Sequence, residues 1–206
     1  MLKVHDPMLW IVFFSQTGSE IVELVKEIGR KPDLIITNNL EDKIKFHPGI
    51  REMGVVIQSS KHEGLMDYLR FQHIYNTNDV LITLHGYLRI IPADICEKYQ
   101  IYNGHPGYIV QYPELKGKDP QVRAFEAKHK WIGSVIHKVT AGVDEGPVID
   151  SSGIPNTVKT LDEMYSTLKR ISLYLWIKFM WGKINEDSNK WRTVSRKDNP
   201  PERFTV

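Results

Sequence analysis

The regular pattern of this chain begins with Leu9-Trp10-Ile11-Val12-Phe13-Phe14, followed directly by Ser15-Gln16-Thr17-Gly18-Ser19-Glu20. A continuous apolar run of this kind predicts a strand that is buried on both faces of a parallel sheet. The segment from Thr17 to Glu20 has the spacing of a helix capping box. After it, apolar residues recur at helical intervals, at Ile21, Leu24, Val25 and Ile28. The stretch therefore predicts a strand that leads into a helix, which is the start of an alternating α/β fold.

Further apolar runs repeat this alternation. Strands are expected at 33–38, 54–57, 80–84 and 101–103, with a helix from Leu65 to Ile74. This order predicts an open, mostly parallel, Rossmann-like sheet with flanking helices and right-handed crossovers. Ligands of such sheets bind beyond the carboxyl ends of the strands. We therefore expect a functional site at the end of the strand at 101–103.

The second half of the chain has a different pattern. A helix is expected from Gly117 to Lys128, two strands at 134–139 and 148–151, and a long helix from Leu161 to about Gly182. We therefore divide the chain into a main domain at 1–182 and a C-terminal tail at 183–206, which is expected to be a hairpin or an irregular arm.

Composition limits the classes of function. The chain has 206 residues, a formal net charge of +2 and 41% hydrophobic residues, which fits a soluble globular protein rather than a nucleic-acid-binding one. No run approaches the ~20 apolar residues of a membrane span, and the first residues lack the features of a signal peptide. Cys96 is the only cysteine, so an internal disulfide is excluded and a cytoplasmic location is expected. The histidines show no metal-ligand spacing, so no metal site is predicted.

Two motifs carry side chains that could act together in catalysis. Asn103-Gly104-His105-Pro106 puts an amide and an imidazole on the same side of an extended strand end. Ala141-Gly142-Val143-Asp144-Glu145-Gly146-Pro147-Val148-Ile149 holds a carboxylate in a glycine-bracketed loop. An amide donor, a titratable ring and a carboxylate that orients the ring are the parts of an acyl-transfer site. Each motif alone would be read as a simple turn, but the two together favour a site.

The same motifs resemble those of the folate-dependent formyltransferases. The resemblance rests on the order and spacing of segments that cover nearly the whole chain: Ser15–Ser19, Leu84–Pro92, Asn103–Pro106, Tyr112–Pro113, Gly133–Thr140 and Val143–Ile149. It implies a formyltransferase catalytic domain, 10-formyltetrahydrofolate as co-substrate, and catalytic roles for Asn103, His105 and Asp144. Asn103 would donate a hydrogen bond to the formyl oxygen, and protonated His105 would offset the developing charge. Asp144 would orient His105 and raise its pKa.

The resemblance also implies two ligand sites. The folate pocket would be lined on one side by Leu88, Arg89, Ile90 and Ile91, and on the other by Val139, Thr140, Ala141, Gly142 and Val143. The acceptor would bind near Ser15, Thr17, Gly18, Ser19, Glu20 and Gly86, where backbone amides at a helix start can hold a phosphate. Plain core packing is the alternative for the apolar residues, and Arg89 would either reach solvent or meet the folate glutamate. His137 is expected to be a hydrogen-bonded core or supporting histidine rather than a proton-transfer group.

The departures from the family pattern concern the acceptor. Glu20 stands where the glycinamide ribonucleotide enzymes carry an asparagine, the segment 107–120 differs and is longer, and the helix from Leu161 lacks a clear acidic counterpart. A carboxylate that faces a phosphate would repel it. This favours a nucleotide-linked amino sugar as acceptor, with phosphoribosylglycinamide as the alternative. A formyltetrahydrofolate hydrolase and an inactive folate-binding protein rank lower, and a transfer-RNA formyltransferase would need a further basic domain. A monomer or homodimer with no nucleic-acid or membrane partner is expected.

Overall fold

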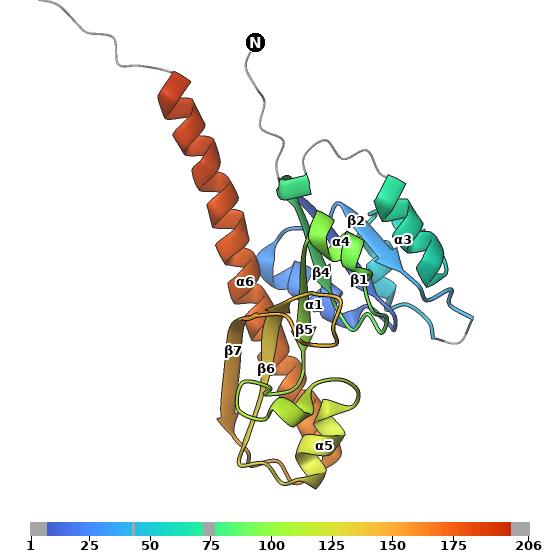
Figure 1. Ribbon diagram of the computed structural model, residues 1–206, viewed down its shortest axis with the longest axis vertical. Helices are drawn as coiled ribbons and strands as arrows, with labels where there is room; N and C mark the ends of the chain where they lie inside the picture. The colour runs from blue at the N-terminus through green and yellow to red at the C-terminus, as the bar shows by residue number, and fades with distance from the viewer. Residues whose placement is uncertain (1–7, 43, 72–76, 199–206) are drawn as a thin grey trace, which may run out of the picture.

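The computed structural model describes residues 8–42, 44–71 and 77–198, with side chains as far as residue 186 (Figure 1). Within these residues the chain forms a seven-stranded sheet in the order β3-β2-β1-β4-β5-β6-β7. Strands β1 to β5 pair in parallel, and β6 and β7 extend the sheet as antiparallel strands. The strands are β1 Leu9–Phe14, β2 Leu34–Thr37, β3 Ile57–Ser59, β4 Val80–Leu84, β5 Gln100–His105, β6 Trp131–Lys138 and β7 Val148–Pro155. The prediction of an open, mostly parallel α/β sheet is confirmed.

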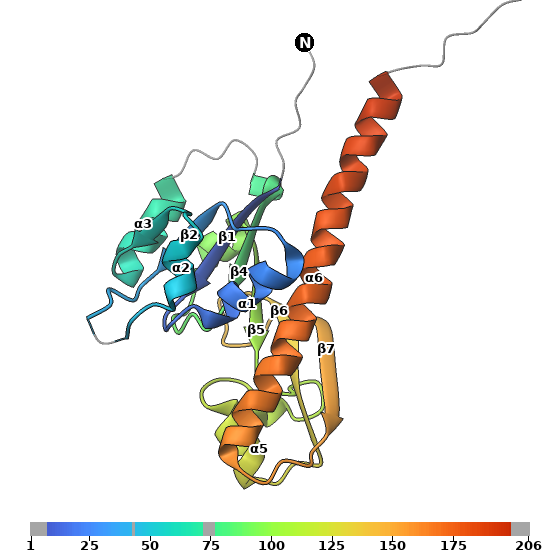
Figure 2. The same ribbon diagram turned by 180° about the vertical axis from the view of Figure 1, so that it is seen from behind.

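Helices cover both faces of the sheet. They are α1 Ser19–Ile28, α2 Pro48–Glu52, α3 His62–Phe71, α4 Ala93–Lys98, α5 Pro120–Glu126 and α6 Leu161–Asp198, with short 3-10 turns at Thr77–Asp79 and Pro113–Leu115. One core packs α1, α5 and α6 against the sheet, and the other packs α3 and α4 against the opposite face. Figure 2 is the view in which α1, α2 and α6 lie in front.

Strand β1 shows why the apolar run forms a central strand. Trp10, Val12 and Phe14 point into the core under α1 and α6. Ile11 and Phe13 point into the core under α3 and α4. Because side chains alternate along a strand, only an unbroken apolar run can serve two cores at once.

Several predicted boundaries are wrong by a few residues. The third strand was expected from Gly54 but begins at Ile57, and the helix expected from Gly117 begins at Pro120. Helix α2 was not predicted. The capping box is also absent, because α1 begins after Gly18 and no side chain caps it. The end predicted for α3, Ile74, lies outside the described residues.

Helix α6 is longer than the sequence pattern indicated. Its first half packs Leu168, Leu175 and Trp176 into the core. The helix does not end near Gly182 but continues to Asp198, and its last turns extend past the sheet in both views (Figures 1 and 2). Residues 183–198 are therefore helical, which corrects the expected hairpin or irregular arm over that range. None of the described helices is both long and apolar enough to cross a bilayer.

Candidate active site

The site lies where β1, β4 and β5 end. The register pairs Phe13 with Leu84 and Leu84 with Asn103, so the carboxyl ends of the three strands lie side by side. The loops that follow are tied together, because the Ser15 hydroxyl accepts a hydrogen bond from the Leu88 amide at 2.8 Å. Ser15 N–H also donates to the Gly86 carbonyl at 3.2 Å. The loops around Ser15 and Leu88, which were predicted to hold the acceptor and the folate, therefore meet at the carboxyl ends of the central strands.

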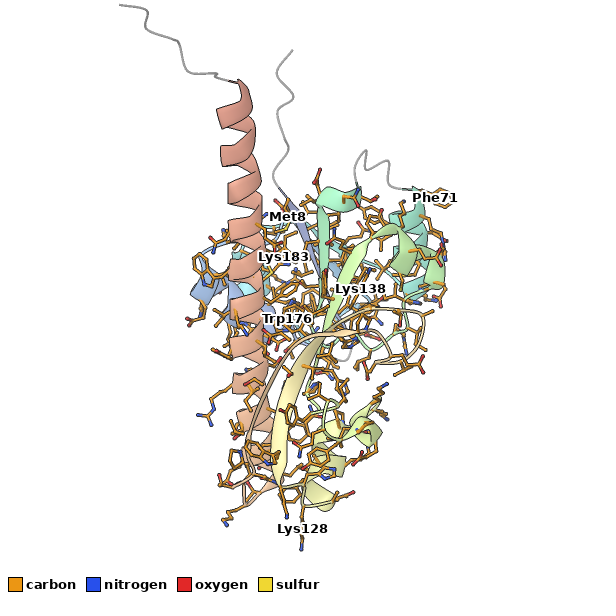
Figure 3. All side chains as sticks on the ribbon, turned by 60° about the vertical axis from the view of Figure 1, so that its left-hand side comes forward. Met8, Phe71, Lys128, Lys138, Trp176 and Lys183 are labelled. Carbon is orange, nitrogen blue, oxygen red and sulfur yellow. The ribbon has the colours of Figure 1, made fainter. Side chains whose placement is uncertain are left out.

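Strand β5 carries the amide and the imidazole. It runs to His105, so Asn103 and His105 alternate with Gly104 and lie on the same side of the strand. Gly104 is required there, because a Cβ at this position would lie 2.6 Å from Nε1 of the buried Trp176 on the opposite face. Figure 3 shows Trp176 on the side of α6 that faces the sheet. The backbone of β5 at Gly104 therefore packs closely against Trp176, on the face opposite Asn103 and His105.

Asp144 completes the group of three residues predicted to be catalytic. It lies in the β6–β7 connection with a φ of +52°, a left-handed conformation that aspartate tolerates better than most residues. Its Oδ2 is 3.2 Å from Nδ1 of His105, and it accepts a hydrogen bond from the Gly117 amide at 2.8 Å. The carboxylate and imidazole that the sequence placed together are in contact. Their catalytic roles stay a prediction.

The second nitrogen of His105 is also engaged. Nε2 lies 2.9 Å from the Leu115 carbonyl oxygen, which can only accept, so this nitrogen carries a proton. Burial lowers the pKa of His105 below its ordinary value, and the attraction of Asp144 offsets only part of this effect. Asp144 raises the pKa of His105 as expected, but burial outweighs this contribution. With the Nε2 proton directed at Leu115, Nδ1 can donate to Asp144 Oδ2 only when the ring is protonated.

His137 belongs to the site more closely than the sequence indicated. The β5–β6 register sets it directly opposite Asn103. Its Nε2 lies 3.1 Å from Asn103 Nδ2 and 3.2 Å from Asp144 Oδ1, while its Nδ1 contacts the Lys138 carbonyl at 3.1 Å. Without a proton, Nε2 can accept a hydrogen bond from Asn103 Nδ2; with a proton, it can donate to Asp144 Oδ1. The tautomer of His137 therefore couples Asn103 to Asp144.

The two histidines also hold Asp144 in its charged form. Burial by itself raises the pKa of Asp144. The hydrogen bond from His137, the charge of His105 and the Gly117 amide outweigh this effect and bring the pKa below its usual range. The site therefore favours Asp144 as a carboxylate, with its Oδ2 3.2 Å from Nδ1 of His105.

Glu20 lies in the first turn of α1, as expected from the sequence. Its carboxylate contacts protein groups that the sequence did not indicate: Oε2 lies 2.9 Å from Nδ1 of His85, and Oε1 accepts a hydrogen bond from the Ser172 hydroxyl at 2.6 Å. Burial raises the pKa of Glu20, but the interactions with His85 and Ser172 outweigh this effect and lower it. His85 in turn packs against Trp176 in a tilted arrangement, with ring centroids 4.6 Å apart.

The predicted folate residues divide into two groups. Leu88, Arg89 and Ile90 are exposed on the β4–α4 loop, as a ligand wall requires, and Ala141 and Val143 are exposed on the β6–β7 loop. Ile91 and Val139 are instead buried in the core. Their part in a folate site stays a prediction.

A separate cavity lies at the other end of the sheet. It has a volume of about 210 Å³ and is lined by residues that include Met8, Val80 and Lys183, two of which are labelled in Figure 3. Met8 and Val80 lie at the amino ends of β1 and β4, opposite the end that carries Asn103, and Lys183 lies on α6. The cavity is therefore not part of the site.

The segment that contains this site matches a known family. Residues 11–172 match the family model described as formyl transferase. The chain belongs to the formyl transferase family. The matched range contains the predicted site residues, from Ser15 to Asp144, and the core of the sheet. The division of the chain at residue 182 stays a prediction.

Curated relatives of this formyl transferase family member match over part of their length. Phosphoribosylglycinamide formyltransferase of Bacillus subtilis (strain 168) is 33% identical over 95 residues, which cover 43% of this chain and 47% of the relative. The protein of the same name from Dictyostelium discoideum is 35% identical over 112 residues, 48% of this chain and 54% of the relative. A formyltetrahydrofolate deformylase from Synechocystis is 37% identical over 71 residues, 34% of this chain and 24% of the relative. The chain thus spans about half the length of the first two relatives and less of the third.

Solved structures share the fold. The phosphoribosylglycinamide formyltransferase from Streptococcus pneumoniae TIGR4 has a TM-score of 0.68 at 22% identity, covering 82% of this chain and 94% of that one. The one from Campylobacter jejuni has a TM-score of 0.69 at 16% identity, covering 85% and 100%. At this level of identity the likeness establishes the architecture, and the substrate has to be argued from the site.

Proposed function

We propose that this protein transfers the formyl group of 10-formyltetrahydrofolate to a primary amine. The observation that carries the proposal is the contact of His105 with Asp144, 3.2 Å apart, beside the amide of Asn103 at the carboxyl edge of the sheet. Membership of the formyl transferase family supports the nature of the transferred group. Arranged in this way, the three residues supply a hydrogen-bond donor and a route for a proton, which transfer to an amine needs.

The chemistry follows from the contacts. The acceptor nitrogen attacks the formyl carbon, a carbon–nitrogen bond forms, and negative charge develops on the formyl oxygen. The amide of Asn103, whose direction is fixed by His137, donates a hydrogen bond to this oxygen. The amine proton passes to Asp144, which lies 3.2 Å from Nδ1 of His105, or to a water that Asp144 orders. Collapse then breaks the bond from the formyl carbon to N10 of the folate, and N10 takes up a proton.

We propose phosphoribosylglycinamide as the first acceptor to test. One of the three objections to it was that Glu20 would repel a phosphate at the start of α1. Its two carboxylate oxygens face His85 and Ser172, so both are hydrogen-bonded within the protein. The amides at Gly18 and Ser19 still begin a helix, which favours an anion. The curated relatives of this name support the same choice.

A nucleotide-linked amino sugar is the second candidate. It is favoured by the 107–120 segment, in which exposed Lys116 and Lys118 flank Gly117. The Gly117 amide contacts Asp144, so these two cations lie close to the site and could attract a diphosphate.

The test is a comparison of acceptors with the purified chain. We expect N-formyl product, identified by mass spectrometry, with phosphoribosylglycinamide at a kcat/KM of at least ~10⁴ M⁻¹s⁻¹, an ordinary enzymatic value. Parallel reactions contain a nucleotide-linked amino sugar, or no amine at all. Product only with the amino sugar would favour the second candidate. Formate released at the same rate without any amine would contradict transfer and indicate hydrolysis.

A further inference from the structure

One short segment touches both members of the His105–Asp144 pair. This segment, Glu114–Lys118, supplies the Leu115 carbonyl that contacts Nε2 of His105 at 2.9 Å. It also supplies the Gly117 amide that donates to Asp144 at 2.8 Å. The position of the 114–118 segment therefore sets the distance between the imidazole and the carboxylate.

A single side chain on α5 binds the segment along its length. The guanidinium of Arg123 donates to the carbonyls of Glu114, Leu115, Lys116 and Lys118, with distances of 3.1 Å to Leu115, 2.7 Å to Lys116 and 3.1 Å to Lys118. The Leu115 carbonyl thus receives hydrogen bonds from both Arg123 and His105.

Other contacts of the segment are less extensive. Leu115 is buried in the same core as Ala124 of α5, and Oε1 of Glu114 lies 3.3 Å from Nε2 of His129, while Lys116 and Lys118 are exposed. Its backbone N–H groups at Leu115 and Lys116 donate only within short-range turns, to Tyr112 and Pro113. Arg123 is the side chain of α5 that binds four of its carbonyls.

We propose that Arg123 is a positioning residue, which holds the 114–118 segment so that His105 and Asp144 stay in catalytic contact. The inference rests on the proposed function, because it assigns a role in that same site. A planar guanidinium presents five N–H donors in a fixed fork, and this suits several carbonyls of one turn. A lysine has the charge but only one nitrogen, so it cannot bind the same set.

Three variants separate position from charge and from general damage. Arg123→Ala removes the donors and the charge, and Arg123→Lys keeps only the charge. Arg70→Ala is the matched control, since Arg70 also makes three hydrogen bonds, to Asp67 and Asp94 on the α3–α4 side. Thermal unfolding of all three establishes that they fold.

The first readout does not depend on activity. Amide hydrogen exchange of the 114–118 segment, and of Gly117 in particular, should quicken in Arg123→Ala and Arg123→Lys but not in Arg70→Ala. Nitrogen-15 spectra of the histidine rings should show that the Nε2 proton of His105 exchanges faster with water in both Arg123 variants. Unchanged exchange at Gly117 and His105 would overturn the proposal.

The second readout is turnover. We expect kcat to fall by about 10²-fold in both Arg123 variants, the scale of a misplacement near 1 Å, with KM for the folate nearly unchanged. Low concentrations of guanidinium ion, far below those that unfold proteins, should restore part of the activity of Arg123→Ala. Parental kcat in Arg123→Lys would mean that charge alone matters, and would also overturn the proposal.

The two hypotheses fail in different ways. If the parent chain transfers no formyl group to any amine, the proposed function fails, while exchange and ring spectra still report whether Arg123 orders the segment. If the parent is active and Arg123→Ala keeps its kcat, only the role of Arg123 fails.

Discussion

Replacing Asp144 by asparagine tests the centre of the site with the smallest change in shape. Asparagine tolerates a φ of +52° as well as aspartate does, so the left-handed backbone is kept. Alanine would add strain there and confuse the result. What changes is chemistry, because one of two accepting oxygens becomes a donating NH2 group.

The cost follows from the contacts of Asp144. Its Oδ2 accepts from Gly117, and its Oδ1 faces His137. If the NH2 group takes the Oδ2 position, it meets the Gly117 N–H; at the Oδ1 position, it meets His137. In the first orientation the Gly117 N–H loses its acceptor, which lowers the free energy of unfolding by roughly 1–3 kcal/mol. For a chain of this length each kcal/mol corresponds to about 2–4 °C in Tm.

The pH dependence has a defined sign. The folded-state pKa of Asp144 lies below its ordinary value. The stability that the carboxylate contributes is therefore fully present above the ordinary pKa, and it is lost as pH falls through the folded value. The difference in unfolding free energy between parent and variant should be constant near neutral pH and shrink in acid below about pH 4.

Urea unfolding and turnover at neutral pH measure both consequences. We expect kcat to fall by at least about 10²-fold, the scale of a lost proton-transfer group. The pKa of His105 should fall further, since the Asp144 charge that raises it is gone. Asp150→Asn is the control. Asp150 lies on β7 and forms an ion pair with Lys178 of α6, so this variant should leave turnover unchanged. Parental turnover in Asp144→Asn, together with an unshifted His105 titration, would refute the reasoning.

Further predictions concern the same strand and the core behind it. Asn103→Ala and His105→Ala should each fold and lose about 10²-fold in turnover, measured with the true amine. The pH profile of kcat/KM should decline in acid only below the ordinary histidine value of 6.5, since burial lowers the pKa of His105; a profile that rises in acid would show that the protonated ring is needed. Gly104→Ala should cost about 1–3 kcal/mol in urea unfolding, because the new methyl group meets Trp176, and Trp176→Phe should relieve part of the loss. Glu20→Gln should cost roughly 1–3 kcal/mol, since one of its two accepting oxygens becomes a donor.

Most strands of the sheet could be predicted, because a short apolar run in the sequence is enough to indicate a buried strand. Leu9–Phe14 could only be a strand buried on both sides, and Val80–Leu84 likewise matched its strand. Helix α2 was missed because Pro48–Glu52 is too short to show a helical period. The length of α6 was underestimated because the pattern after Gly182 is polar and resembles a tail.

The site was predictable only in part. Asn103 and His105 are two residues apart on one strand, so their common direction follows from geometry alone. His137 is different, because its place opposite Asn103 depends on the antiparallel register of β5 and β6. No local pattern in either strand fixes that register. The Leu115 carbonyl and Gly117 amide are backbone groups, which carry no signal in the sequence.

The position of Glu20 decides how the acceptor side should be interpreted. From the sequence it was a carboxylate at a helix start, and its charge was one of three departures that argued against phosphoribosylglycinamide. Its partners, His85 and Ser172, lie 65 and 152 residues away in the chain, so no local pattern could reveal them. Because both oxygens of Glu20 are hydrogen-bonded within the protein, its charge is a weaker argument against a ribonucleotide phosphate. We expect substitutions in the 107–120 segment to change substrate preference without changing the chemistry, since exposed Lys116 and Lys118 flank Gly117, whose amide contacts Asp144.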